Sequence, residues 1–181
     1  GIRDSSVTGV QTCALPIFGT LNKGESFLED KQYPEAIKTI ETALDLAKLN
    51  QINNYNHFGY NLWGRAHREQ ESYDKALDYY EQSILNNQYY YPAQIGKGVT
   101  LNYLEKLQEA LDAFNQILIN QDRYNNFDDA KRAEVWFYKG LVFEKLNQCQ
   151  RAIAAYETAI QYRPDYQAAE EARLAAQKRC Q

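Results

Sequence analysis

The side chains that most often carry catalysis or bind metals are scarce in this sequence. Histidine occurs twice, at His57 and His67, and neither has a carboxylate or cysteine at the spacing of a metal site. The segment Gly96-Lys97-Gly98 is too short for a phosphate-binding loop and falls inside an expected helix. No nucleophile is paired with a base, and no acidic pair has a setting suited to acid–base chemistry. We therefore expect a non-catalytic protein with no metal and no cofactor.

The three cysteines, Cys13, Cys149 and Cys180, offer little more. Cys149 lies three residues before Ala152, at a position that the repeat described below directs toward the core, so we expect it to be an inert, small hydrophobic side chain. Cys180 is expected to be a free thiol in a tail. Reduced thiols of this kind favour a cytoplasmic setting.

Composition limits the classes of function further. The chain has 181 residues, of which 44% are hydrophobic and 13% aromatic, enough apolar surface to form a packed core rather than a disordered chain. A net charge of −4 argues against a nucleic-acid partner. The apolar runs are far shorter than a membrane span, so no membrane partner is expected. Oligomeric state cannot be read from these numbers.

The first seventeen residues differ from the rest. Residues 7–17 resemble the translation of a sequencing adapter, and methionine is absent from the whole chain. We therefore expect residues 1–17 to be a non-native segment and the native chain to have begun upstream of Phe18. A genuine N-terminal arm or an atypical signal peptide is the alternative interpretation.

The remaining sequence repeats. Four alanines, which we call the anchors, are 40, 34 and 42 residues apart, which indicates a 34-residue unit with insertions of six and eight residues. A glycine lies twelve residues before each anchor, and a residue with a large side chain lies four residues after each anchor. The anchors are Ala36, Ala76, Ala110 and Ala152; the glycines are Gly24, Gly64, Gly98 and Gly140; the large residues are Ile40, Tyr80, Phe114 and Tyr156.

Each unit predicts two helices, because apolar residues recur at helical spacing in both of its halves. We expect the glycine of the first helix to face the anchor alanine of the second, with the large side chains filling the space around that contact. Pro34 and Pro92 suit the first turn of a helix, where a missing N–H is harmless. Ser72 and Asp165 are the expected N-caps.

This pattern resembles the tetratricopeptide repeat, a 34-residue helix-turn-helix that stacks into a right-handed superhelix. The fourth unit carries the best match, with Trp136, Gly140, Phe143, Ala152, Tyr156, Ala159 and Pro164. The resemblance implies an all-α fold, a right-handed α-solenoid of four helical hairpins plus a C-terminal capping helix. The hairpins are expected at residues 18–50, 57–90, 91–124 and 133–166, with the capping helix and tail at 167–181.

The resemblance also implies a concave surface lined by the first helix of each hairpin. Its expected partner-binding residues are Asn61, Arg65, Arg68, Ile95, Val99, Asn102, Tyr103, Phe137, Leu141 and Glu144. They form a basic, amide-bearing stretch in the second hairpin and an apolar stripe in the third and fourth. A peptide or helix with a hydrophobic anchor and an acidic neighbour would complement both. The alternative is that the apolar residues pack between adjacent hairpins.

The expected function is therefore a protein–protein interaction scaffold that binds a peptide or helix of a partner. The alternative is the regulatory or targeting arm of a larger enzyme whose catalytic domain lies upstream. The lysine–asparagine pair with which some members of the family grip a C-terminal carboxylate is missing from the groove positions. Two inserts rich in amides and carboxylates, near residues 50–56 and 121–129, are expected at one edge of the solenoid.

Overall fold

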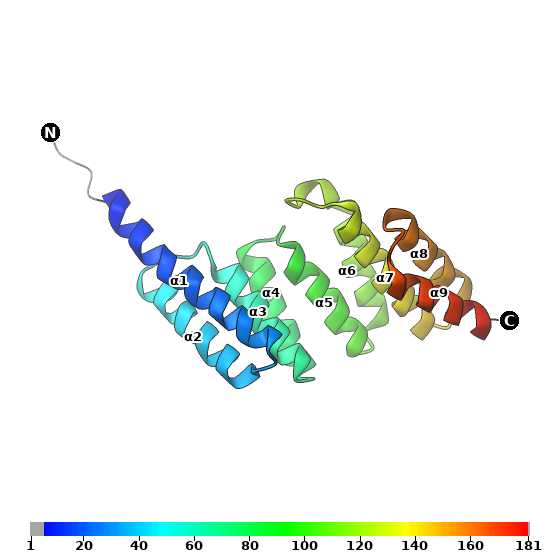
Figure 1. The fold of residues 1–181 in the computed structure, drawn as a ribbon, viewed down its shortest axis with the longest axis horizontal. Coiled ribbons are helices and arrows are strands. Elements are labelled where there is room, and N and C mark those ends of the chain that lie inside the picture. The colour runs from blue at the N-terminus through cyan, green and yellow to red at the C-terminus, as the bar shows by residue number, and fades with distance from the viewer. Residues whose placement is uncertain (1–5, 181) are drawn as a thin grey trace. The chain divides into compact units, whose positions relative to one another are not determined.

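In a computed structural model, the backbone is described for residues 6–180 and the side chains for residues 15–180. Over that range the chain forms α-helices and one short 3₁₀ helix, with no strand (Figure 1). The helices are α1 (Ser6–Glu29), α2 (Tyr33–Leu49), α3 (Asn56–Glu69), α4 (Tyr73–Asn86), α5 (Tyr91–Tyr103), α6 (Leu107–Ile119), η1 (Gln121–Arg123), α7 (Asp129–Lys145), α8 (Cys149–Tyr162) and α9 (Gln167–Arg179). The expected all-α class is confirmed.

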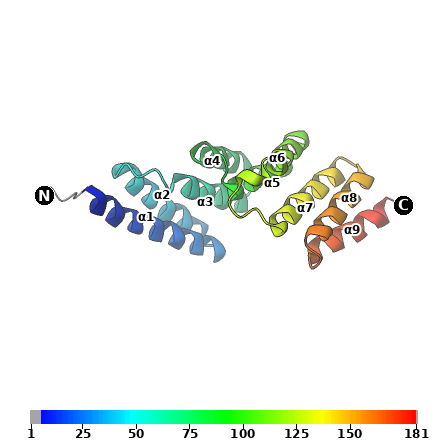
Figure 2. The same cartoon turned by 90° about the horizontal axis from the view of Figure 1, so that it is seen from above.

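The chain divides into two compact units, residues 1–96 and 97–181. The first unit contains α1 to α4 and the beginning of α5. The second contains the end of α5 and all that follows, and within it α7, α8 and α9 lie side by side (Figure 2). Each unit buries its own apolar residues, so each is described separately.

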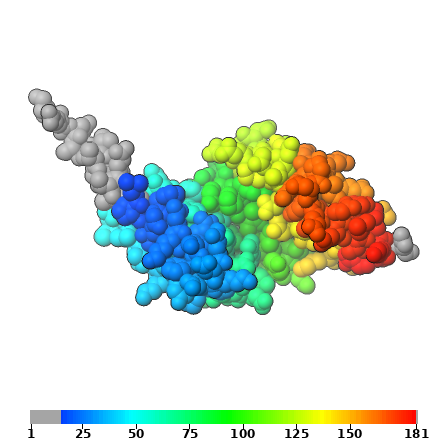
Figure 3. Space-filling model, viewed as in Figure 1, coloured from blue at the N-terminus to red at the C-terminus, as the bar shows by residue number. Residues whose placement is uncertain are grey.

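The first unit is organised around α1, which covers much of its visible face (Figure 3). Ile17 and Leu21 of α1 are buried and pack in one cluster with Ile40 of α2 and Leu62 of α3. Helix α1 continues back through Pro16 to Ser6. The prediction that residues 1–17 are non-native stays a prediction; its first five residues lie outside the described part of the chain.

One turn geometry joins the helices of every hairpin. The residues Lys31, Glu71, Glu105 and Asn147 all have φ between 56° and 58°. In each turn the next residue donates its N–H to a carbonyl five residues earlier, as Ser72 does to His67 at 2.8 Å. This is the left-handed helix ending that satisfies otherwise unpaired carbonyls. The four equivalent turns are the backbone counterpart of the repeat in the sequence.

The glycines allow the two helices of each hairpin to pack closely, with the expected large side chains against them. A Cβ at Gly140 would lie 2.3 Å from Cε1 of Tyr156, and one at Gly98 would lie 2.5 Å from Cε1 of Phe114. The same holds for Gly64, where the nearest atom is Tyr80 Cε1 at 2.7 Å. The expected approach to the anchor alanine is present in the first hairpin, where a Cβ at Gly24 would lie 3.7 Å from the Ala36 carbonyl oxygen. Each glycine makes room for the large side chain four residues after the anchor.

The predicted helix starts agree with the structure in part. Pro34 and Pro92 lie in the first turns of α2 and α5, and Ser72 precedes α4, although its side chain forms no capping hydrogen bond. Asp165 is not the N-cap of α9, because Tyr166 occupies that position and Asp165 bonds Arg163 instead. A carboxylate cap that we had not expected begins α7, where Asp128 accepts from the Lys131 N–H at 2.9 Å.

The expectation of free thiols is wrong. Cys149 at the start of α8 and Cys180 just beyond α9 form a disulfide that ties the last helix to the hairpin before it. In the second unit α9 lies on the visible face, drawn in red in Figure 3. Helix α9 fully buries only Ala169 and Ala176, so its apolar contact with the rest of the unit is small. The disulfide adds a covalent link to that contact. The thiols therefore give no support to a cytoplasmic setting.

Candidate functional site

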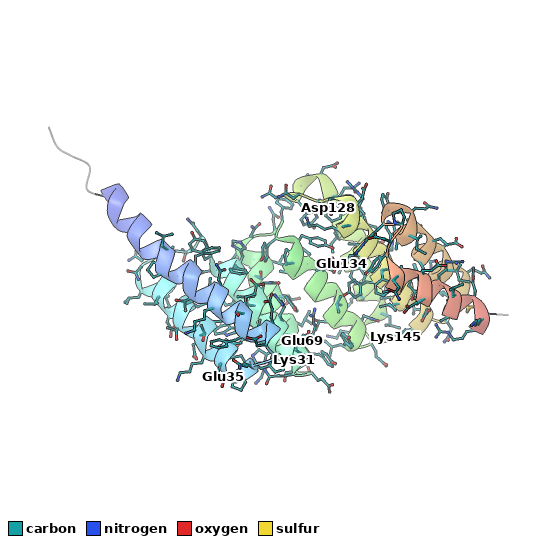
Figure 4. All side chains as sticks on the ribbon, in the orientation of Figure 1. Lys31, Glu35, Glu69, Asp128, Glu134 and Lys145 are labelled. Atoms are coloured by element: carbon teal, nitrogen blue, oxygen red, sulfur yellow. A yellow bond between two sulfur atoms is a disulfide. The ribbon has the colours of Figure 1, made fainter. Side chains whose placement is uncertain are left out.

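Two of the predicted binding residues meet in a cleft of the first unit. The α1–α3 cleft has a volume of about 240 Å³ and lies where α1 turns into α2 against the end of α3. It is lined by Leu28, Glu29, Lys31, Tyr33, Arg65, Arg68 and Glu69. Figure 4 shows Lys31 and Glu69 at the same end of this unit. The cleft thus combines three cations and two carboxylates with the apolar surface of a leucine and a tyrosine.

Both arginines of the α1–α3 cleft already contact carboxylates of the chain. Arg65 donates to Glu25 Oε1 at 2.8 Å, and both side chains remain 34% exposed. Arg68 lies 2.9 Å from Glu69 Oε1. At this exposure such pairs contribute no more than about 1 kcal/mol each. A partner's carboxylate can therefore replace Glu25 or Glu69 at small cost.

Asn61 and Tyr90 lie near the ion pair of Arg65 and Glu25 in the first unit. Asn61, one turn before Arg65, is 3% exposed, and its Oδ1 accepts no hydrogen bond. Burial raises the pKa of Tyr90 to about 12, with Glu25 adding to the rise and Arg65 opposing it. The phenol is therefore a neutral neighbour of the ion pair at physiological pH. Ile95 belongs to this unit as well and is half-buried.

In the second unit the predicted α5 residues differ in exposure. Tyr103 is 53% exposed, whereas Val99 and Asn102 are 6% and 8% exposed. The Lys145 ammonium donates to the Asn102 carbonyl at 2.7 Å and so joins the end of α7 to α5. Of these three residues, only Tyr103 presents a large surface to a partner.

The predicted α7 residues are mostly engaged within the second unit. Phe137 packs against Tyr138, Tyr156 and Tyr166, with ring centroids 5.2 to 5.9 Å apart. Glu144 is 19% exposed and lies 2.6 Å from Arg179 of α9. Leu141 is half-buried. Phe137 thus packs within its own hairpin, and Arg179 of the last helix pairs with the carboxylate of Glu144.

The sequence pattern missed Lys31, Glu29 and Tyr33 as cleft residues. Glu29 ends α1, Lys31 lies in the turn that follows, and Tyr33 begins α2, whereas the register considered only one face of each first helix. The nearest signal was their position shortly after Leu28 in the sequence. Among the described residues, no group of three His, Cys, Asp or Glu side chains could hold a metal ion. No helix in that range is long and apolar enough to cross a membrane.

Fold and site together define a helical-repeat protein with a cleft between its first two hairpins. The sequence pattern of the tetratricopeptide repeat matches residues 61–126 and 103–167, which span more than half of the chain. The chain belongs to the tetratricopeptide repeat family, whose members commonly mediate protein–protein interactions.

Solved structures of the same fold are similar to this chain. A chain of the APC/C hetero-tetramer Cut9–Hcn1 aligns with a TM-score of 0.77 and 20% identity, over 92% of this chain and 31% of that one. YrrB, described as a TPR protein with an unusual peptide-binding site, aligns with a TM-score of 0.65 and 21% identity, over 82% and 70%. The Arabidopsis OM64 TPR domain aligns at 0.61 and 19%, over 70% and 98%. No curated protein matches in sequence.

Proposed function

We propose that this chain is a scaffold that binds a peptide or helix of a protein partner against the first helices of its hairpins. The bound segment carries an acidic side chain beside a hydrophobic anchor. The α1–α3 cleft is the observation that carries this proposal, because one cavity presents Lys31, Arg65 and Arg68 next to Leu28 and Tyr33. Electrostatic complementarity of this kind selects a partner and orients it.

In the second unit, the proposal assigns direct contact to Tyr103 and Leu141. Tyrosines are enriched among the residues that supply most of the binding energy in interfaces, and the half-buried Leu141 adds apolar contact area. Val99 and Asn102 have a supporting role, because their side chains are buried. Phe137 holds the packing behind them through its three aromatic contacts.

A random peptide library displayed on phage tests the proposal. Peptides selected on the wild-type chain are expected to share an acidic residue next to an apolar one. Arg65→Ala with Arg68→Ala should weaken their binding at least tenfold, equivalent to about 1.4 kcal/mol. The ion pairs that these changes remove are exposed, so the fold should persist.

A charge-matched control for the double arginine variant comes from the second helix of each of the first two hairpins. Lys38→Ala with Lys75→Ala also removes two cations, from exposed positions on α2 and α4, and should leave the affinity unchanged. Equal loss of binding in both double variants would show that net charge, and not the cleft, attracts the peptides. Selected peptides without acidic residues would contradict the proposed ligand chemistry.

A further inference from the structure

A second and larger cleft lies between α2 and α3 of the first unit. This α2–α3 cleft has a volume of about 490 Å³, within the usual range for small-molecule sites. It is lined by Leu44, Asp45, Lys48, Gln51, Asn53, Asn56, Tyr60 and Trp63. None of these residues lines the α1–α3 cleft, so the cavity is not part of the proposed peptide site.

One wall of the α2–α3 cleft is aromatic and held in place. The indole N–H of Trp63 donates to the Ile37 carbonyl at 3.3 Å, which anchors the ring to α2. The same ring lies 4.9 Å from Tyr79 and 6.1 Å from Tyr60, measured between centroids. Side chains fixed in this way lose little freedom when a ligand binds.

The rim of the α2–α3 cleft consists of amides from the first insertion of the repeat. Ile52 is 7% exposed and donates its N–H to the Ala47 carbonyl at 2.8 Å, which fastens the inserted segment to α2. Beside it, the Asn56 amide donates to Asn53 Oδ1 at 3.3 Å. The insertion therefore adds the amides of Gln51, Asn53 and Asn56 to a lining that also contains the aromatic wall.

This lining defines the chemistry of the ligand. Asp45 and Lys48 contribute one charge of each sign, so the cleft favours a neutral molecule. An amide both donates and accepts hydrogen bonds, as a hydroxyl does, whereas an aromatic ring covers an apolar surface. A sugar ring offers both partners, with hydroxyls around its edge and C–H groups on its faces.

A proline-rich peptide is the other ligand that aromatic grooves bind. Its carbonyl oxygens accept hydrogen bonds, but its prolines have no N–H to donate. Acceptors of the lining such as the Asp45 carboxylate would then lack a partner, whereas a sugar hydroxyl both donates and accepts. The structure therefore favours the saccharide.

We propose that the α2–α3 cleft binds a short, neutral oligosaccharide. The test is titration of the full chain with cellohexaose, maltohexaose and chitohexaose, followed by tryptophan fluorescence in a Trp136→Phe background. At least one of these sugars should produce a saturable change below about 10 mM, a modest affinity for a half-open site. Absence of a saturable signal with all three would overturn the proposal.

Variants locate the binding. Tyr60→Ala and Asn53→Ala should each weaken sugar affinity at least tenfold, and circular dichroism should confirm that both variants stay folded. The matched control is Tyr103→Ala, which removes an exposed tyrosine from the second unit and should leave sugar affinity unchanged.

Two further probes separate this proposal from others. Arg65→Ala with Arg68→Ala should not alter sugar binding, so failure of the peptide site and failure of the sugar site are distinguishable. A proline-rich dodecapeptide should not bind. Binding of that peptide with the same dependence on Tyr60 would overturn the proposal in favour of a peptide ligand.

Discussion

Replacement of Gly140 by alanine tests the packing of the hairpins most directly. The added Cβ would lie 2.3 Å from Cε1, 2.6 Å from Cδ1 and 2.8 Å from Cζ of Tyr156, distances at which the ring must move. Tyr156 is completely buried, and Phe137 packs beside it with ring centroids 5.9 Å apart, so the ring has little room. Overpacking of this kind costs about 1–3 kcal/mol.

An opposing effect sets the net magnitude. Alanine is favoured over glycine inside a helix by about 1 kcal/mol, which offsets part of the steric cost. We therefore expect Gly140→Ala to lower the free energy of unfolding by up to about 2 kcal/mol. For a unit of this size, that corresponds to a fall in melting temperature of up to roughly 15 °C.

The assay is thermal and urea unfolding followed by circular dichroism, with Gly19→Ala as the matched control. A Cβ at Gly19 meets no atom within 4 Å, so only the helix propensity should change and the chain should gain up to about 1 kcal/mol. A coupling of about 1 kcal/mol between Gly140→Ala and Tyr156→Leu should show that the ring is the obstacle. Equal stabilisation by the two alanines would refute the reasoning.

The remaining predictions concern the disulfide, the histidines and a helix cap. Because Cys149 and Cys180 are 31 residues apart, Cys149→Ser should cost about 3–4 kcal/mol in urea unfolding, and a thiol reductant should have no effect on that variant. Burial lowers the pKa values of His57 and His67, so the unfolded chain binds more protons than the folded chain. The melting temperature should therefore fall as the pH drops from about 7.5 to about 5.5. In the double variant His57→Gln with His67→Gln, the melting temperature should depend less on pH over that range. Asp128→Ala should lower the denaturant midpoint of unfolding, because the Lys131 N–H at the start of α7 loses its side-chain acceptor.

Periodicity alone predicted the helical hairpins and their register. The spacing of Gly140, Ala152 and Tyr156 requires two helices in close contact, because a 3.6-residue period puts these positions on facing stripes. Pro34 and Pro92 located helix starts correctly, since a fixed φ and a missing N–H are well tolerated in the first turn. These features depend on local geometry, which the residue types determine directly.

The candidate site was predictable only in part. The register identified Arg65 and Arg68 as surface residues of α3, and both line the α1–α3 cleft. It did not indicate that Glu25 lies 2.8 Å from Arg65, because that contact joins residues 40 positions apart on different hairpins. Nor did it show that Phe137 is surrounded by three tyrosines.

The sequence by itself determined the repeat, the helix pairs and the family, because each depends on residues within one unit. Only the tertiary structure decided which charges are paired, that Cys149 bonds Cys180, and that the insertion after α2 forms the rim of a cleft. Those features depend on the approach of distant segments. The distance between such segments is set by the packing of whole helices, and no short-range pattern records it.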